Sequence, residues 1–424
     1  MSLRKISVVG LGYIGLPTAA LFASRKIEVS GIDVNQDVVN TINDGEIHIV
    51  EPGLDVLIKA VVSDGYLKAN TIAKPADAFI IAVPTPINND KQADTSFVQA
   101  AIKKIAPVLK KGDLVVLEST CPVGTTELVC EWLRAERKDL IFPKRNTEKS
   151  DIHVAYCPER VLPGNVLHEL INNDRVVGGM TSECANLAVS LYKIFLNSEC
   201  IITDVRTAEM CKLTENAFRD VNIAFANELS LICDDLSINV WELIKLASCH
   251  PRVNILKPGP GVGGHCIAVD PWFIATKSPK EAKLIRQARQ VNENKPEWVI
   301  LKIRKAIEEF LRVNKDADLK EEDVTIACFG LAFKPDIDDL RESPALMIAN
   351  EISNIFMGQV LAVEPNLSMA PESLNSSATF CDHETALQHA QIKIILVAHS
   401  QFKAIQKTEW GNFDCVIDFC GALE

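Results

Sequence analysis

Residues 258–270, PGPGVGGHCIAVD, combine a bare backbone with two groups that could do chemistry. Four glycines lie within residues 258–264, and glycine lets a backbone wrap around a ligand or approach it closely. Cys266 and Asp270 follow directly. A thiolate nucleophile needs such a close approach, and cationic neighbours favour its formation. In isolation Cys266 is better explained as a small buried core residue, but these surroundings favour a nucleophile.

Three polar residues share one face of a predicted helix. Lys212, Asn216 and Arg219 are spaced 4 and 3 residues apart in a stretch, 207–236, that is nearly free of Gly and Pro. The same face becomes apolar further along. A polar, basic end on an otherwise buried helix favours a site, and an exposed face with routine charges is the alternative.

Residues 10–15, GLGYIG, form a GxGxxG motif between a predicted strand and a predicted helix. Gly10, Gly12 and Gly15 permit a tight turn, close approach to a pyrophosphate and close helix–strand packing. The amides of Tyr13 and Ile14 are expected to face phosphates at the helix N-terminus, where anions are favoured. The motif therefore predicts a dinucleotide site.

Asp33 lies at the end of the second predicted strand, 21 residues after Gly12. A carboxylate there accepts hydrogen bonds from ribose hydroxyls and repels a 2′-phosphate, so it favours NAD over NADP. An ordinary glycine turn followed by a surface carboxylate is the alternative.

Other polar residues also follow predicted strands, where ligands of open parallel sheets bind. The hydroxyls of Thr85, Thr120 and Thr126 could contact the dinucleotide or a water beside it, although turn and cap chemistry is equally consistent. Glu159 could be a general base or could pair with Arg160.

Two basic groups suit a diphosphate. Lys334 and Arg341 occupy a loop that follows the predicted strand at 324–329. His250 and Arg252 form a further polar pair before the glycine-rich loop.

The elements that position these residues alternate between strand and helix at both ends of the chain, which indicates βαβ units and parallel sheets. The predicted strands are 6–9, 28–32, 79–83, 114–117, 151–155, 175–177 and 200–202, and then 324–329, 360–363, 392–397 and 415–417. Helical stretches at 207–236 and 279–313 separate the two sets, and Pro296 either kinks the second helix or begins another. The predicted fold is α/β: two Rossmann-like, doubly wound parallel-sheet domains (1–203 and 314–424) joined by a central helical dimerisation segment (204–313).

Composition restricts the class of protein. The 424 residues include 44 Lys+Arg and 56 Asp+Glu, and the net charge of −12 argues against nucleic-acid and membrane partners. No apolar run approaches the ~18–20 residues of a membrane span, and no signal peptide is recognisable, so we expect a cytoplasmic protein. The 13 cysteines lack paired or zinc-ligand spacing, which predicts reduced thiols and no metal.

Five segments together resemble the UDP-glucose/GDP-mannose dehydrogenase family: ESTCPVGTTE, YCPERVLPG, KLTENAFRDVNIAFANELS, PGPGVGGHCIAVDPWF and FGLAFKPDIDDLRESP. The resemblance covers essentially the whole chain. It implies that the C6 alcohol of a UDP-sugar substrate is oxidised to a carboxylate with two NAD, in a homodimer. The segments HCIAVDPWF, KLTENAFRDVNIAFANELS and HPRVNIL most resemble the bacterial branch that acts on UDP-N-acetyl-D-mannosamine. The dehydrogenases for UDP-glucose usually carry a Phe in the glycine loop and Pro-Lys after the cysteine, where this chain has Val262, Ala268 and Val269.

The resemblance also implies residue roles. Cys266 would be the nucleophile and Lys212 the acid/base or oxyanion-stabilising partner. Asp270 and Glu159 would position or activate water, supported by Thr120 and Asn216. NAD would be held by Gly10, Gly12, Tyr13, Ile14, Gly15, Asp33, Thr85, Thr126 and Arg341. The UDP-sugar would contact Arg160, Val161, Lys212, Asn216, Arg219, His250, Arg252, Gly263, Phe333 and Lys334, and Arg252 would reach the neighbouring subunit's site.

Alternatives remain at this point. A UDP-N-acetylglucosamine or UDP-glucose 6-dehydrogenase would share these motifs, and bacterial surface polysaccharide synthesis would use the product. A two-electron hydroxyacid dehydrogenase would need no thiol after the glycine loop. A non-catalytic nucleotide-sugar sensor would be expected to lack Cys266 or Lys212.

Overall fold

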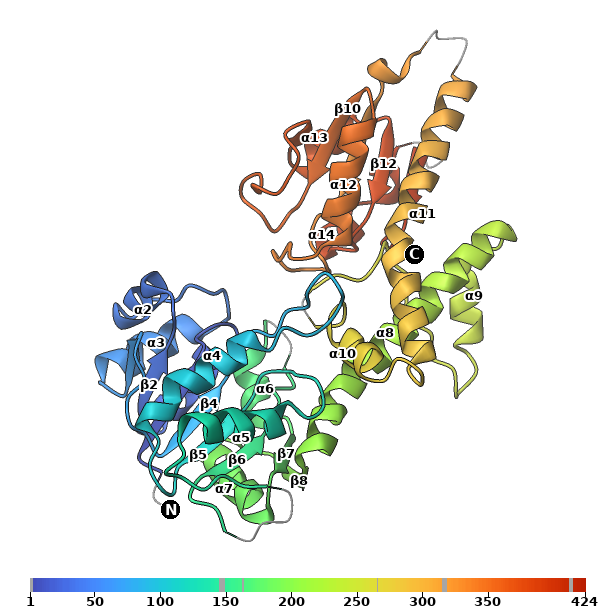
Figure 1. The fold of residues 1–424 in the computed structure, drawn as a ribbon. Coiled ribbons are helices and arrows are strands. Elements are labelled where there is room, and N and C mark those ends of the chain that lie inside the picture. Colours follow the sequence, from blue (N-terminus) through green and yellow to red (C-terminus); the bar gives the residue numbers. More distant parts are fainter. Residues whose placement is uncertain (1–2, 145–148, 162–163, 265, 315–318, 412–414) are drawn as a thin grey trace. The chain divides into compact units, whose positions relative to one another are not determined.

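The computed structural model describes residues 3–144, 149–161, 164–264, 266–314, 319–411 and 415–424 (Figure 1). The chain forms two compact units. The first contains Met1–Glu215 and Trp272–Ser278, and the second contains Asn216–Pro271 and Pro279–Glu424. Each unit has one sheet of mainly parallel strands.

The first unit has an eight-stranded sheet in the order β3-β2-β1-β4-β5-β6-β7-β8. Its strands are β1 (Lys5–Val9), β2 (Glu28–Ile32), β3 (Leu67–Asn70), β4 (Ala78–Ile81), β5 (Leu114–Leu117), β6 (His153–Tyr156), β7 (Arg175–Gly179) and β8 (Cys200–Asp204). The first six strands have the order of dinucleotide-binding sheets. This confirms the predicted Rossmann-like domain, and sheets of this kind are expected to bind ligands at the carboxyl ends of β1 and β4, where the strand order reverses.

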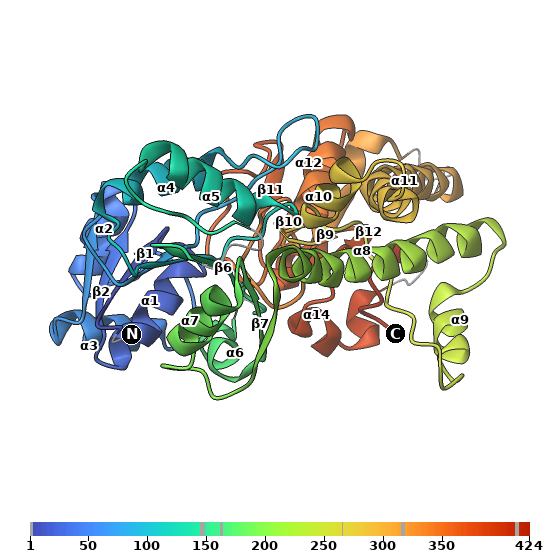
Figure 2. The ribbon, with the colours of Figure 1, turned by 60° about the horizontal axis from the view of Figure 1, so that its bottom comes forward.

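Helices cover both faces of this sheet, which is why its inner strands are apolar on both sides (Figure 2). One face carries α1 (Gly15–Ser24), α2 (Gln36–Asn43), α3 (Leu54–Ser63), α6 (Val166–Asn172) and α7 (Ser182–Tyr192). The other carries α4 (Ser96–Ile105), η1 (Ala106–Val108) and α5 (Thr125–Glu136). On β1, Ile6 and Val8 pack into the core on the face that carries α1, and Val9 packs into the core on the face that carries α4, because successive side chains of a strand point to opposite faces.

One pairing departs from the predicted parallel order. Strand β7 is antiparallel to β6 and parallel to β8. Strand β7 begins near the carboxyl end of β6 and runs back beside it. The connection containing α6 therefore does not have to carry the chain back to the amino-terminal end of β6, as a parallel crossover would.

The second unit has a five-stranded parallel sheet in the order β11-β10-β9-β12-β13. Its strands are β9 (Thr325–Phe329), β10 (Gln359–Val363), β11 (Ala378–Phe380), β12 (Ile392–Ile395) and β13 (Val416–Asp418). Its shorter helices are η3 (Glu321–Asp323), α12 (Pro344–Ile355), α13 (His383–His389), α14 (Ser400–Ala404) and η4 (Lys407–Trp410). The order repeats that of β3-β2-β1-β4-β5, which confirms the second predicted Rossmann-like domain.

Two 31-residue helices form most of the predicted central helical segment: α8 (Val205–Asp235) and α11 (Lys283–Val313). They are accompanied by α9 (Val240–Ala247) and α10 (Asp270–Lys277). Pro296 lies inside α11 and does not begin a new helix. Helix α11 starts four residues later than the predicted position 279, and its apolar side packs on the core of the second sheet.

Within the second unit, α8 and α11 are joined by buried polar contacts. Arg289 lies 2.7 Å from Asp220, and the Asn227 amide donates to Asn292 at 2.8 Å. Residue numbers rise together along both helices, so the helices run parallel. No helix in the part of the chain that the structure describes has the length and apolarity needed to cross a membrane.

Candidate active site

The glycine motif opens α1 as predicted. Gly10 has φ +89°, and a Cβ there would lie 2.7 Å from the Ala82 carbonyl oxygen. A Cβ on Gly15 would lie 1.8 Å from the Gly10 carbonyl oxygen, whereas one on Gly12 would meet nothing within 4 Å. The fold itself therefore requires the first and third glycines. The open space at Gly12 fits a pyrophosphate lying against the backbone. Tyr13 and Ile14 precede α1 at this turn.

Asp33 ties the end of β2 to this turn. Its Oδ2 accepts from the Leu11 amide and its Oδ1 from the Asn35 amide, both at 3.0 Å. The side chain is half-buried, and each carboxylate oxygen has a second lone pair that a ribose hydroxyl could use.

The loops after β4 and β5 are joined to each other. The Thr85 hydroxyl donates to the Thr120 carbonyl oxygen at 2.5 Å, and the Ser119 hydroxyl donates to the Val83 carbonyl oxygen at 2.6 Å. Both loops lie beside the strand reversal, so Thr85 and Thr120 lie where the sheet topology predicts a ligand.

Thr126 occupies a different environment from the other two threonines. Its hydroxyl and its amide donate to Oε1 of Glu209, at 2.7 and 2.8 Å, and the Gly124 amide donates to Oε2 at 2.6 Å. Burial raises the pKa of Glu209, and these hydrogen bonds oppose that shift. The N-terminus of α5 is thus capped by a carboxylate of this chain.

Lys212 and Glu159 form a buried ion pair in the first unit. The Lys212 Nζ lies 3.1 Å from Oε1 of Glu159, and both side chains are nearly enclosed. Oε2 of Glu159 accepts from the Val161 amide at 2.9 Å, so the carboxylate is fixed at both oxygens. Of the two alternatives for Glu159, the pairing with the adjacent Arg160 is not formed, because Arg160 lies 2.7 Å from Glu215 and Glu159 pairs with Lys212.

Asp270 and Asn216 meet in the second unit. The Asn216 amide donates to Oδ2 of Asp270 at 2.5 Å, and both residues are buried. The Asp270 amide donates to the Cys266 carbonyl oxygen at 2.9 Å, which forms a turn at the start of α10. Of the 13 cysteines, only Cys266 and Cys249 are exposed.

The glycine-rich loop packs against residues 333–344. A Cβ on Gly263 would lie 2.5 Å from the Glu342 carbonyl oxygen, and one on Gly264 would lie 3.0 Å from the Phe333 ring. A Cβ on Gly261 would lie 2.9 Å from Pro344. These three glycines are therefore required by close packing within the chain, a reason that the sequence pattern did not reveal.

The two predicted diphosphate-binding groups, Lys334 and Arg341, have different neighbours. Lys334 is half-buried, and burial lowers its pKa, with the positive charge of Arg219 acting in the same direction and Asp339 opposing. Arg219 itself is exposed. Arg341 forms a two-pronged ion pair with Asp339, with contacts of 2.6 to 3.0 Å.

His250 and Arg252 lie after α9, and both are exposed. The Arg252 amide donates to Nδ1 of His250 at 3.3 Å, so the structure brings these two residues together in a local turn.

Glu118 and Glu209 are among the buried carboxylates that sequence reasoning missed. Arg175 lies 2.9 Å from Glu118, its guanidinium stacks over Tyr192 at 4.3 Å, and burial raises the pKa of Glu118. Glu118 opens the ESTCPVGTTE segment directly after β5, and a carboxylate at the end of a predicted strand could have identified it as a candidate. Glu209 lies three residues before Lys212 on α8, where helical spacing could have identified it.

Comparison with known families gives a match along most of the chain. Residues 4–196 match the NAD binding domain of the UDP-glucose/GDP-mannose dehydrogenase family, residues 206–294 its central domain and residues 327–424 its UDP binding domain.

Individual proteins are similar over nearly the full length. A UDP-N-acetyl-D-mannosamine dehydrogenase of Yersinia pestis is 60% identical over 414 residues, which are 97% of this chain and 98% of that protein. An NDP-N-acetyl-D-galactosaminuronic acid dehydrogenase of Ralstonia nicotianae is 58% identical over 95% of this chain and 92% of its own. The solved structure of a UDP-D-ManNAc dehydrogenase from Pyrococcus horikoshii has a TM-score of 0.84 at 37% identity, covering 99% of this chain and 96% of that one.

Proposed function

Since this chain belongs to the UDP-glucose/GDP-mannose dehydrogenase family, we propose that it oxidises the C6 alcohol of UDP-N-acetyl-D-mannosamine to the carboxylate with two NAD. A relative named for this sugar that is 60% identical along nearly the whole chain supports the choice of substrate. The observation that carries the proposal is an exposed thiol, Cys266, in a turn closed by Asp270, whose carboxylate is held by Asn216.

The reaction removes four electrons from one carbon. The turn at residues 10–15 would hold NAD, which would supply the hydride acceptor for each oxidation. In the first oxidation the C6 hydroxyl loses a proton and C6 loses a hydride, while Lys212 serves as acid/base or stabilises the charge on oxygen. The Cys266 thiolate then adds to the aldehyde carbon and forms a thiohemiacetal, which loses a second hydride and becomes a thioester.

Water completes the sequence by hydrolysing the thioester. Asp270 and Glu159 position or activate this water, supported by Thr120 and Asn216, and the carbon–sulfur bond breaks to restore Cys266. In total, one alcohol, two NAD⁺ and one water give one carboxylate, two NADH and three protons.

Ligand contacts follow the family resemblance. On the NAD side these are Gly10, Gly12, Tyr13, Ile14, Gly15, Asp33, Thr85, Thr126 and Arg341. On the UDP-sugar side they are Arg160, Val161, Lys212, Asn216, Arg219, His250, Arg252, Gly263, Phe333 and Lys334. Thr126 and Arg341 already bind Glu209 and Asp339, just as Arg160 binds Glu215 and Lys212 binds Glu159, so a ligand would have to compete with these partners.

A second candidate differs only in the sugar. The Ralstonia nicotianae relative is named for an N-acetylgalactosaminuronic acid and is 58% identical, so identity alone separates the two sugars poorly. We retain an N-acetylhexosamine of different stereochemistry as the alternative substrate.

One assay tests the proposal. The purified protein is given UDP-N-acetylmannosamine, UDP-N-acetylglucosamine, UDP-N-acetylgalactosamine and UDP-glucose in parallel, and NADH is counted against sugar consumed. We expect the highest kcat/KM with UDP-N-acetylmannosamine and two NADH per sugar. One NADH per sugar would contradict the thioester route, and a clear preference for another sugar would contradict the substrate.

We also propose a homodimer formed through α8. Phe218, Phe225 and Ile232 are spaced seven residues apart on one side of this helix and are 69%, 53% and 46% exposed, apolar side chains that a second copy would cover. Light scattering should give twice the 46.6 kDa chain mass. Phe225→Asp should give the monomer mass, and a monomeric wild-type protein would contradict the proposal.

The proposed product, a UDP-sugar acid, is an activated donor for a glycosyltransferase. We propose that it supplies bacterial surface polysaccharide synthesis and that the reaction takes place in the cytoplasm, where NAD and UDP-sugars are available.

A further inference from the structure

The turns after β1 and β9 are built alike. The Gly10 amide donates to the Ile32 carbonyl oxygen at 2.8 Å, and the Gly330 amide donates to Val363 at 2.8 Å. Both glycines have positive φ, +89° and +94°. An acidic residue follows the neighbouring strand in each sheet: Asp33 after β2, and its counterpart after β10.

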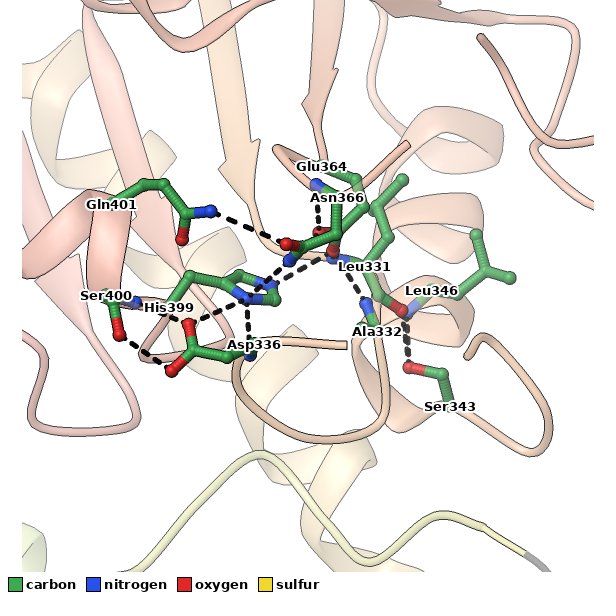
Figure 3. A network of polar contacts seen from close by, with 10 residues as sticks. All are labelled: Leu331, Ala332, Asp336, Ser343, Leu346, Glu364, Asn366, His399, Ser400 and Gln401. Carbon is green, nitrogen blue, oxygen red and sulfur yellow. Dashed lines mark hydrogen bonds and ion pairs between the residues drawn. The ribbon is translucent and has the colours of Figure 1, made fainter. Parts of the chain in front are cut away.

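That counterpart, Glu364, is committed to contacts within the chain. Its Oε2 accepts from the Leu331 and Ala332 amides at 2.8 and 2.9 Å and lies 3.1 Å from Nε2 of His399 (Figure 3). Its Oε1 accepts from Asn366. Glu364 is 2% exposed, whereas Asp33 is half-buried. The second turn is therefore held by side chains of the protein.

The contacts of His399 determine which ring nitrogen carries the proton. The Asp336 amide, which can only donate, lies 2.9 Å from Nδ1, so Nδ1 is an acceptor. The proton is then on Nε2, which donates to Glu364. The ring is fully buried and packs edge-on against Phe402.

His399 thereby holds both sides of one short segment. Through Glu364 it fixes Leu331 and Ala332, and through Nδ1 it fixes Asp336. Asp336 has φ +62°, and its carboxylate accepts from the Ser400 amide and hydroxyl, each at 2.7 Å. A non-glycine residue in this conformation needs such surroundings to hold it. Phe333 and Lys334 lie between the two anchored points.

We propose that His399 is a positioning residue for nucleotide-sugar binding, because it holds Phe333 and Lys334 in place through Glu364 and Asp336. The inference rests on the proposed function in one respect, namely that Phe333 and Lys334 contact the UDP-sugar.

Three variants separate the contacts of the two ring nitrogens of His399: Nδ1, which faces the Asp336 and Asn366 amides, and Nε2, which faces Glu364. His399→Asn places an amide oxygen near the position of Nδ1 and keeps an acceptor for Asp336. His399→Gln places an amide nitrogen near Nε2 and keeps a donor for Glu364, and His399→Ala removes both. Gln401→Ala is the matched control, because Gln401 is exposed and reaches the network only through a 3.4 Å contact with Asn366.

The measurements are the Kd of UDP and of NAD by calorimetry, and hydrogen exchange at residues 331–336. We expect His399→Ala to raise the Kd of UDP about tenfold, which corresponds to about one lost hydrogen bond, with the Kd of NAD unchanged. Exchange should quicken at Asp336 in His399→Gln and at Leu331 and Ala332 in His399→Asn. Gln401→Ala should behave as wild type.

UDP binding without turnover separates this inference from the proposed reaction. If no UDP-sugar is oxidised but His399→Ala still weakens UDP binding, the positioning role stands and the proposed function fails. The positioning role would be overturned if the Kd of UDP were unchanged in folded His399→Asn and His399→Gln. A wild-type protein that does not bind UDP would also overturn it. So would a rise in hydrogen exchange that is equal across the whole second unit.

Discussion

The Asn216 side-chain amide donates a 2.5 Å hydrogen bond to the carboxylate of Asp270, 54 residues further along the chain. Both residues are buried, and the Asp270 backbone in turn holds the carbonyl of Cys266. One amide on α8 thus fixes the orientation of a carboxylate in the same turn as the proposed nucleophile.

Replacing Asn216 with Ala should lower both stability and turnover. The change removes a donor to a buried carboxylate, which typically costs about 1–3 kcal/mol. We expect a lower melting temperature and a fall in kcat of about tenfold or more, measured by calorimetry and NADH formation. Asn222→Ala is the control, because the Asn222 amide bonds only locally, to the Phe218 carbonyl. Equal behaviour of the two variants would contradict a role for this contact.

Cys266→Ser should bind UDP-sugar and NAD but fail to form the acid. A serine hydroxyl is a much weaker nucleophile than a thiolate, so no thioester accumulates. We expect NADH to fall from two per sugar to one at most. Cys249→Ser replaces the other exposed cysteine and should retain wild-type stoichiometry. Wild-type turnover in Cys266→Ser would refute the covalent route.

The wild-type protein should use NAD in preference to NADP, because a 2′-phosphate would meet the carboxylate of Asp33. Asp33→Asn removes the charge and keeps one acceptor for the Leu11 or Asn35 amide. We expect the ratio of kcat/KM for NAD to kcat/KM for NADP to fall by about tenfold. A change of this size corresponds to losing one charge-assisted hydrogen bond between the carboxylate and a ribose hydroxyl. Equal use of both coenzymes by the wild type would count against the ribose contact.

Stability should rise with pH between about 7 and 10 because of Lys295. Burial lowers the pKa of this lysine from 10.5 to about 7, with Asp234 opposing the change. Between these values the unfolded chain holds a proton that the folded chain lacks. Raising the pH therefore favours the folded state, by roughly 1.4 kcal/mol for each pH step of one within that range.

Urea unfolding at pH 7, 8 and 9 measures this effect. Lys295→Met should show a smaller increase of unfolding free energy with pH than wild type. Lys305→Met, which changes an exposed lysine on the same helix, should retain the wild-type slope. Parallel pH curves for wild type and Lys295→Met would contradict the prediction.

Local patterns predicted most of the fold. The strands that became β1, β2, β5, β9 and β10 were expected within one residue of their observed bounds, because buried parallel strands are short apolar runs. Strands β3 and β11 were missed; both are edge strands of four or three residues with only half-apolar patterns. The antiparallel direction of β7 was also missed, because strand direction depends on the path of the connecting chain.

The sequence by itself determined the chemical types present: a glycine turn opening a helix, an acidic residue after β2, and a cysteine and an aspartate after a glycine-rich loop. Those features are short-range, since neighbouring residues and helical or strand periodicity suffice to define them. Only the tertiary structure decided the partners, such as Thr126 with Glu209, 83 residues away, and Glu364 with His399, 35 residues away. It also assigned three glycines of the 258–264 loop to packing on residues 333–344. Hydrogen bonds and steric contacts act over a few ångströms in space, and only the folded path of the chain brings such distant positions together.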